Sequence, residues 1–148
     1  MSATLLDAST RAQLTARVQA LDPGARPLWG RMDLVAMLNH LNLSFKAASG
    51  ELRLKRALIG RLFGGVAKRV FLAGGRDFTR NSPTDPGLLQ QGGDHEAARS
   101  ELLQRIEAFA KPGGIADHPH AFFGPLTRDE WGVLMAKHLD HHLRQFGA

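Results

Sequence analysis

Apolar residues recur at helical spacing along most of this chain, and this period limits its fold more than any other feature. Four segments with this spacing each follow a residue suited to cap a helix, and each ends at glycine or proline. No segment combines strand-like alternation with enrichment in β-branched residues. The sequence therefore predicts an all-α protein, an antiparallel four-helix bundle with a long connection between its second and third main helices.

The capping residues give the expected bounds of these helices. Thr127 and Glu130 form a capping box, in which each side chain accepts a hydrogen bond from the backbone N–H of the other residue. Residues 52–93 show a looser pattern, and we expect them to form one short helix and a long crossover. The four main helices are expected from Asp7 or Ser9 to about Leu21, from Asp33 to Ser49, from Asp94 to Lys111, and from Thr127 to near Gly147.

Length and composition set the expected class of protein. With 148 residues, the chain is expected to form one domain over residues 1–148. Charged residues interrupt the apolar residues near the N-terminus, so we expect no signal peptide and a cytoplasmic location. No uncharged apolar run approaches the roughly 20 residues that span a bilayer, so no membrane partner is expected. Because cysteine is absent, a metal would have to bind to histidine or carboxylate side chains.

Positive charge is concentrated in the predicted crossover. The formal net charge is +5, and residues 53–80 hold eight Lys and Arg residues with Asp77 as their one acidic neighbour. Such a segment can attract an anionic partner. Nucleic acid is disfavoured as that partner because no recognised nucleic-acid motif accompanies the charge.

The histidines of the last helix carry the strongest chemical signal. His138 and His142 are four residues apart, so they share one helix face with Trp131, and this is the expected core side. Two neighbouring buried imidazoles are costly without a shared partner, and a metal ion would satisfy both. His141 lies at the edge of this face and Gln145 lies one turn beyond His142. Both are candidates for a catalytic or supporting role.

His40 supplies a third imidazole from the core stripe of the second helix. The predicted metal ligands are therefore His40, His138 and His142. Three neutral imidazoles suit Zn²⁺, Ni²⁺ or Fe²⁺ and leave coordination positions open for water or a substrate.

The other histidines are interpreted differently. His95 stands beside the Asp94 cap, and His118 and His120 lie in the loop that leads to the last helix. Loops carry such residues without a function, so we expect His118 and His120 to be exposed to solvent.

Together these residues resemble the DinB-like, or YfiT-like, family of metal-binding four-helix bundles. The resemblance rests on His138-x-x-x-His142-x-x-Gln145 and on Trp29-Gly30-Arg31-Met32-Asp33 leading to His40, where that family has a tryptophan, a capped helix and its first histidine ligand. Residues 123–127 and the closing histidine-rich run are similar to a branch of this superfamily catalogued as a domain of unknown function.

The resemblance implies a metal-dependent enzyme with a tri-histidine site and a small-molecule substrate. It would be a transferase or isomerase that uses a low-molecular-weight thiol, bound to the metal through sulfur, or a hydrolase-like enzyme. The residues leave two alternatives open, namely a non-catalytic helical interaction module with a structural metal, and a binder of an anionic partner through residues 53–80. They also leave open whether the chain is a monomer or a homodimer.

Overall fold

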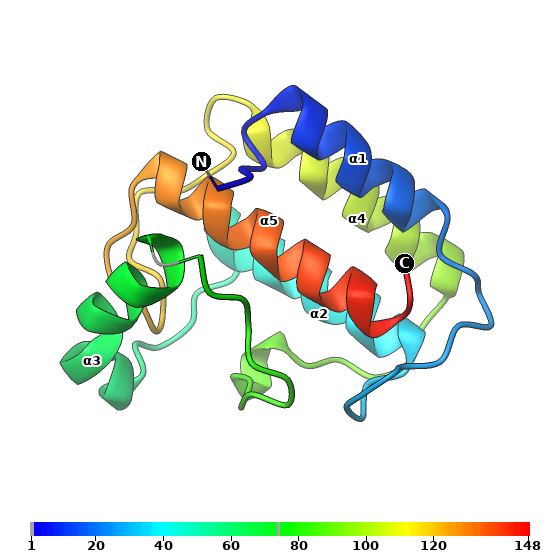
Figure 1. The fold of residues 1–148 in the computed structure, drawn as a ribbon, viewed down its shortest axis with the longest axis horizontal. Helices are drawn as coiled ribbons and strands as arrows, with labels where there is room; N and C mark the ends of the chain where they lie inside the picture. The colour runs from blue at the N-terminus through cyan, green and yellow to red at the C-terminus, as the bar shows by residue number, and fades with distance from the viewer. Residues whose placement is uncertain (1, 74) are drawn as a thin grey trace.

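Four long helices form a closed ring in the computed structural model, which describes residues 2–73 and 75–148. They are α1 (Ala8–Gln19), α2 (Leu34–Ser49), α4 (His95–Ala110) and α5 (Arg128–Gln145). Around the ring, α1 packs against α4, α4 against α2, α2 against α5, and α5 against α1 (Figure 1). The prediction of an all-helical bundle with four main helices is confirmed.

The helices run in two opposite directions, α1 with α5 and α2 with α4 (Figure 1). The Leu5 N–H donates to the Gly132 carbonyl oxygen at 2.9 Å, which joins the starts of α1 and α5. Arg99, near the start of α4, donates to the Gln19 carbonyl oxygen at the end of α1. The pairs α1–α4 and α2–α5 are therefore antiparallel, as predicted, whereas α1–α5 and α2–α4 are parallel. The parallel α2–α4 pair requires the long crossover, which returns the chain to the end where α2 began.

The predicted capping residues start all four helices. The carboxylates of Asp7, Asp33 and Asp94 each accept a hydrogen bond from a backbone N–H of the first turn that follows. Thr127 and Glu130 form the complete capping box at the start of α5. Each such cap stabilises its helix by about 0.5–2 kcal/mol. The bounds of α2, α4 and α5 therefore fall close to the predicted ones.

Large apolar side chains from each of the four helices fill the centre of the ring. Leucine dominates this core, and each fully buried leucine stabilises the fold by about 1.5–3 kcal/mol relative to an exposed one. The largest fully buried side chains are Leu5, Val18, Met37, Leu38, Leu41, Leu102, Ile106, Leu139 and Leu143.

The crossover between α2 and α4 contains the predicted short helix, α3 (Leu58–Lys68), which lies beside one end of the bundle (Figure 1). It continues into a π-helical turn, η1 (Arg69–Ala73), and a later 3₁₀ turn, η2 (Pro86–Leu88). The η1 turn packs against α5 and the η2 turn packs against α2. The crossover thus touches the two helices that carry the predicted ligands. None of the helices formed by the described residues is both long and apolar enough to cross a lipid bilayer.

Candidate metal centre

Three histidines from α2 and α5 meet inside the bundle. His40 comes from α2, and His138 and His142 come from successive turns of α5. Because these helices are antiparallel neighbours, the first half of α2 faces the second half of α5. Nε2 of His138 lies 2.9 Å from Nε2 of His40 and 3.2 Å from Nε2 of His142. One ligand atom from each of the three residues lies within 4.8 Å of the other two.

The other ring nitrogen of His40 and of His142 points away from this cluster, toward an oxygen atom. Nδ1 of His40 lies 2.9 Å from the Leu88 carbonyl oxygen, and Nδ1 of His142 lies 2.7 Å from Oε1 of Gln145. An amide or peptide oxygen accepts but does not donate, so each Nδ1 carries the proton. In a neutral imidazole the Nε2 atom then holds the lone pair. His40 and His142 therefore both direct a lone pair toward His138.

A further contact fixes which way the Gln145 amide points. Its Nε2 group donates to the Trp29 carbonyl oxygen at 2.9 Å, which leaves its Oε1 atom facing His142. Trp29 precedes a turn at Gly30, where φ is 81°, a left-handed conformation that favours glycine. A Cβ atom at Gly30 would also lie 2.8 Å from Nε2 of Gln145. The turn therefore positions Gln145, and Gln145 positions His142.

His138 cannot donate a hydrogen bond to both His40 and His142. A neutral imidazole has a single N–H, which can donate to one of the two facing lone pairs. A metal ion, in contrast, accepts a lone pair from each of the three rings. Metal-bound histidines usually donate their other N–H to a carbonyl or carboxylate oxygen, as His40 and His142 do here.

The spacing of the nitrogens also fits a metal ion. Two nitrogens bound at about 2.0–2.1 Å to a tetrahedral ion are separated by about 3.3 Å. The 2.9 and 3.2 Å separations around His138 are close to this value. The tri-histidine group can therefore hold a metal ion of the size of Zn²⁺, although all-nitrogen donors of this kind do not distinguish Zn²⁺ from Ni²⁺ or Fe²⁺.

Burial favours the neutral form of all three imidazoles. His40 is 3% exposed and His142 is 8% exposed, whereas His138 is partly exposed. Burial lowers the pKa of His142 to about 3, with His40 as the next cause. Burial likewise lowers the pKa of His40 and lowers that of His138 well below its ordinary value. Since neutral imidazole is the form that binds metals, the cluster is in its metal-binding form at neutral pH.

His141, a predicted catalytic candidate, lies directly beside the cluster. Its ring centroid is 5.0 Å from that of His142 and 5.6 Å from that of Trp29. Phe78 of the crossover covers both His141 and His138, with centroids 5.6 and 5.2 Å away. These aromatic rings bury His141 to 8% exposure, more than its position at the edge of the helix face suggests. Burial lowers the pKa of His141, and the charge of the nearby Arg144 adds to this effect.

Two carboxylates of α5, Asp140 and Glu130, make their contacts away from the three clustered histidines. Asp140 accepts a hydrogen bond from Arg17 at 2.7 Å and forms an ion pair with Arg144 at 3.0 Å. Glu130 completes the capping box and pairs with Lys68 at 3.4 Å. Neither carboxylate forms a hydrogen bond or an ion pair with the three clustered histidines.

Lys137 of α5 forms hydrogen bonds that hold the crossover against the cluster. Nζ of Lys137 donates to the carbonyl oxygens of Phe71 at 2.8 Å and Arg76 at 2.7 Å. The ring of Phe71 in turn contacts that of Phe78, with 4.6 Å between centroids. These contacts hold Phe78 against His138.

The interpretation of His118 and His120 as exposed loop residues is wrong, since both are partly buried. Nδ1 of His120 accepts hydrogen bonds from the N–H groups of Phe122 and Phe123 at 3.0 and 3.1 Å, and the ring packs on Trp131. The imidazole thus organises a turn that folds back onto α5. Burial lowers the pKa of His120 to about 4.

Two contacts of the cluster come from residues that the sequence patterns did not single out, the Leu88 carbonyl and the Phe78 ring. For Leu88 the sequence does contain a local indication of structure, because Asp85-Pro86-Gly87 is typical of a turn. In the structure the Asp85 carboxylate accepts a hydrogen bond from the Gly87 N–H at 2.8 Å. Phe78 has no comparable signal, since its position depends on the path of the whole crossover.

Comparison with known proteins places nearly the whole chain in one family. The family model described as "Protein of unknown function (DUF1569)" matches residues 3–148, which include all three clustered histidines, Gln145 and the Trp29–Gly30 turn. No curated protein and no solved structure matches the chain. On the basis of this match over residues 3–148, the chain belongs to the DUF1569 family.

Proposed function

We propose that this protein binds one divalent transition metal ion through His40, His138 and His142 and acts as a metal-dependent enzyme on a small molecule. The observation that carries the proposal is the orientation of the imidazoles. Leu88 and Gln145 accept the outward N–H groups, so two lone pairs converge on a third imidazole, His138, which can donate to one of them. A metal ion resolves this conflict.

The resemblance to the DinB-like family suggests the class of reaction, the transfer of a group by means of a low-molecular-weight thiol. A bound Zn²⁺, Ni²⁺ or Fe²⁺ ion would lower the pKa of a coordinated thiol or water and so supply a nucleophile in a chain without cysteine. Three protein ligands leave at least one coordination position for such a molecule.

The residues around the cluster have separate roles in this proposal. Gln145 and the Leu88 carbonyl hold two ligands in the tautomer that binds a metal. Trp29 and Phe78 exclude water from the ring of His141. The His141 ring forms no hydrogen bond within residues 2–73 and 75–148, so we assign it the exchange of a proton with a bound molecule.

The metal content of protein purified without a histidine tag tests the first part of the proposal. We expect close to one Zn, Ni or Fe atom per chain by elemental analysis. His40→Ala and His138→Ala should each abolish metal binding, and His95→Ala should leave it intact, because His95 lies outside the cluster. Protein that carries no metal and takes up neither Zn²⁺ nor Ni²⁺ in calorimetry at neutral pH would contradict the proposal.

A second measurement distinguishes a metal ion with an open coordination position, as a catalytic site requires, from a metal ion with a purely structural role. Protein loaded with Co²⁺ should change its absorption spectrum when a small thiol is added, because sulfur would enter the open coordination position. A spectrum that responds to neither thiols nor competing anions would identify the metal as structural.

A further inference from the structure

The crossover helix α3 exposes its large apolar side chains to solvent. The exposed fractions of Leu58, Ile59, Leu62, Phe63 and Val66 lie between 60% and 79%. At about 100° per residue, these positions fill an arc of about 140° on one side of the helix. Val70, in the following π-helical turn, is 44% exposed and extends the sequence of exposed apolar positions. A contiguous exposed patch of this kind marks an interaction surface.

The opposite side of α3 is the side that faces the protein. Gly60 and Gly64 are buried, and a Cβ atom at either position would collide with the Phe122 carbonyl oxygen. The Ala57 N–H donates to the Ala121 carbonyl oxygen at 2.9 Å just before the helix, and Lys68 at its end donates to the Pro125 carbonyl oxygen. The helix therefore contacts the rest of the protein through its small residues, and its large apolar residues point toward solvent.

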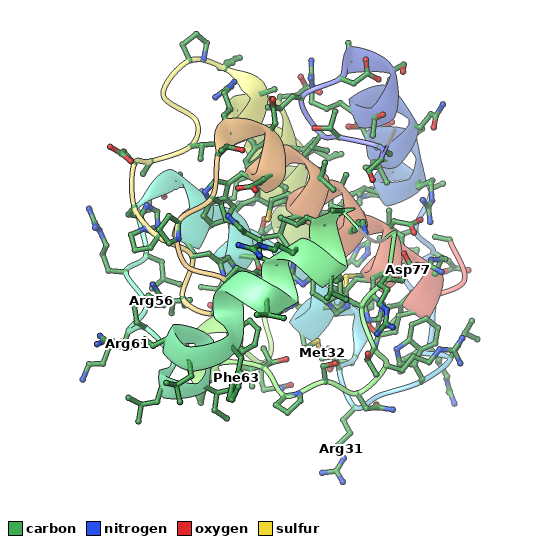
Figure 2. All side chains as sticks on the ribbon, turned by 60° about the vertical axis from the view of Figure 1, so that its left-hand side comes forward. Arg31, Met32, Arg56, Arg61, Phe63 and Asp77 are labelled. Atoms are coloured by element: carbon green, nitrogen blue, oxygen red, sulfur yellow. The ribbon has the colours of Figure 1, made fainter. Side chains whose placement is uncertain are left out.

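Exposed cations accompany this apolar face. Arg53 and Lys55 precede α3, Arg61 lies within it and Arg69 follows it, and all four are exposed. Figure 2 shows Arg61 extending from α3 into solvent, with Phe63 on the same helix. None of these four cations forms an ion pair with any residue in the described part of the chain. Asp77, the one carboxylate of residues 53–80, pairs with Arg144.

We propose that the outward face of α3 docks on the surface of an anionic lipid bilayer. A helix in this role lies in the plane of the bilayer, with its apolar face below the headgroups and its arginines and lysines among the lipid phosphates. Arg61 and Arg69 suit this position because their long side chains can cover apolar surface and still reach the headgroups. The expectation of no membrane partner rested on the absence of a spanning segment, and a helix on the surface needs none.

A second copy of the chain fits this face less well than an anionic bilayer does. A symmetric dimer joins the same patch on both subunits, so it would bring Arg61 and Arg69 close to the same residues of the other copy. No carboxylate lies between residues 53 and 73 to offset that repulsion. An anionic bilayer supplies the apolar layer and the negative charge together.

Co-sedimentation with lipid vesicles tests the proposal on the full chain. The protein should bind vesicles of phosphatidylcholine mixed with phosphatidylglycerol, and it should bind vesicles of phosphatidylcholine alone far more weakly. The double variant Leu62→Ser, Phe63→Ser should bind at least tenfold more weakly, because two large apolar groups are lost. Arg61→Gln should weaken binding about fivefold. All three side chains are exposed, so these variants should fold as the parent does.

The connection between α1 and α2 offers matched controls, because Leu28 is 70% exposed and Arg26 is exposed. Leu28→Ser and Arg26→Gln should leave vesicle binding unchanged. Equal binding to both kinds of vesicle, equal losses in the controls, or no binding at all would overturn the proposal. A concentration-dependent dimer that the Leu62, Phe63 double variant abolishes would overturn it in favour of self-association.

The absence of cysteine allows a site-specific readout. Leu62→Cys and Leu28→Cys can each be labelled with an environment-sensitive fluorophore at one position. Anionic vesicles should shift the emission of the label at residue 62 toward that of an apolar environment and leave the label at residue 28 unchanged. Labels that respond alike, or a label at residue 62 that does not respond, would contradict docking through α3.

Discussion

Gln145 is the residue through which the backbone of the α1–α2 connection reaches the histidine cluster. It donates to the Trp29 carbonyl oxygen and accepts the Nδ1 proton of His142. Its side chain is 4% exposed, so neither contact is readily replaced by water. The tautomer of His142, and with it the lone pair offered to a metal, therefore depends on one amide group.

Gln145→Leu should lower the affinity for metal by about 10–100-fold, because His142 would lose the acceptor that fixes its tautomer. Competition with a chromophoric chelator measures this affinity directly. The matched control is Gln104→Leu, at an exposed position of α4. Equal affinities of the Gln145 variant and the parent protein would show that the outward hydrogen bond does not support the site.

His120 offers a separate test of the effect of burial on an imidazole. Its pKa is about 4 in the folded protein against about 6.5 in the unfolded chain, so the unfolded chain binds the proton first as pH falls. The associated stability is complete above about pH 6.5 and is lost as pH falls from there toward about pH 4. His120→Asn keeps an acceptor for the Phe122 and Phe123 N–H groups but removes the titration.

The free energy of unfolding of the parent protein should therefore fall by about 2 kcal/mol more than that of His120→Asn between about pH 7 and about pH 4.5. Urea denaturation of both proteins in the presence of chelator, at a series of pH values, gives the two curves. A constant difference between them would mean that the pKa of His120 is not lowered in the folded state.

At the scale of elements, glycine positions decide how α3 is attached. A Cβ atom at Gly64 would meet the backbone of Phe122 and Phe123, whereas a Cβ atom at the adjacent Gly65 would meet no atom within 4 Å. The two glycines therefore form a matched pair on one helix.

Gly64→Ala should displace α3 at a cost of about 1–3 kcal/mol, because backbone atoms cannot rotate out of the way as a side chain can. Gly65→Ala should instead stabilise the helix by about 0.5–1 kcal/mol. Limited trypsin cleavage at Arg61, which reports local opening of α3, should become faster in the first variant and slower in the second. Similar cleavage rates in the two variants would show that α3 is not held through its glycine face.

The main helices could be predicted because their signals are local. Asp33 and Gly50 mark the ends of α2 in the sequence itself, and the core stripe places His40 inward. The same reasoning placed His138 and His142 on the core side of α5. Gln145, the outward partner of His142, lies one turn away on the same helix and could be singled out from the sequence. The outward partner of His40 could not, because the Leu88 carbonyl is 48 residues from His40 in sequence and reaches it only through the crossover. The prediction that His120 is exposed was wrong because its hydrogen-bond donors are backbone N–H groups. Every residue type except proline has such a group, so the sequence gives no specific signal for this contact.

At the scale of the whole molecule, the bundle core does not depend on the histidine cluster. Its largest fully buried side chains are apolar residues from all four main helices. The protein without metal should therefore remain helical, and a bound metal should add stability to a fold that already exists.

Removal of the metal should lower the melting temperature at about pH 7.5 and have a much smaller effect at about pH 5. Protons compete with the metal for the three imidazoles, so the stability that the metal adds is present at neutral pH and is lost on acidification. Differential scanning calorimetry with and without chelator at both pH values measures the two shifts. An equally large shift at about pH 5 would point to carboxylate ligands in place of histidines.

The outward hydrogen bonds of the cluster lead to connecting segments, the crossover at Leu88 and the α1–α2 turn at Trp29. Connecting segments tolerate substitution and insertion far better than a packed core does. The strength with which His40 and His142 donate electrons to a metal can therefore change while the three histidines and the helices that carry them stay the same. In the proposed metal site, metal preference and reactivity could therefore be altered by substitutions in these connecting segments alone.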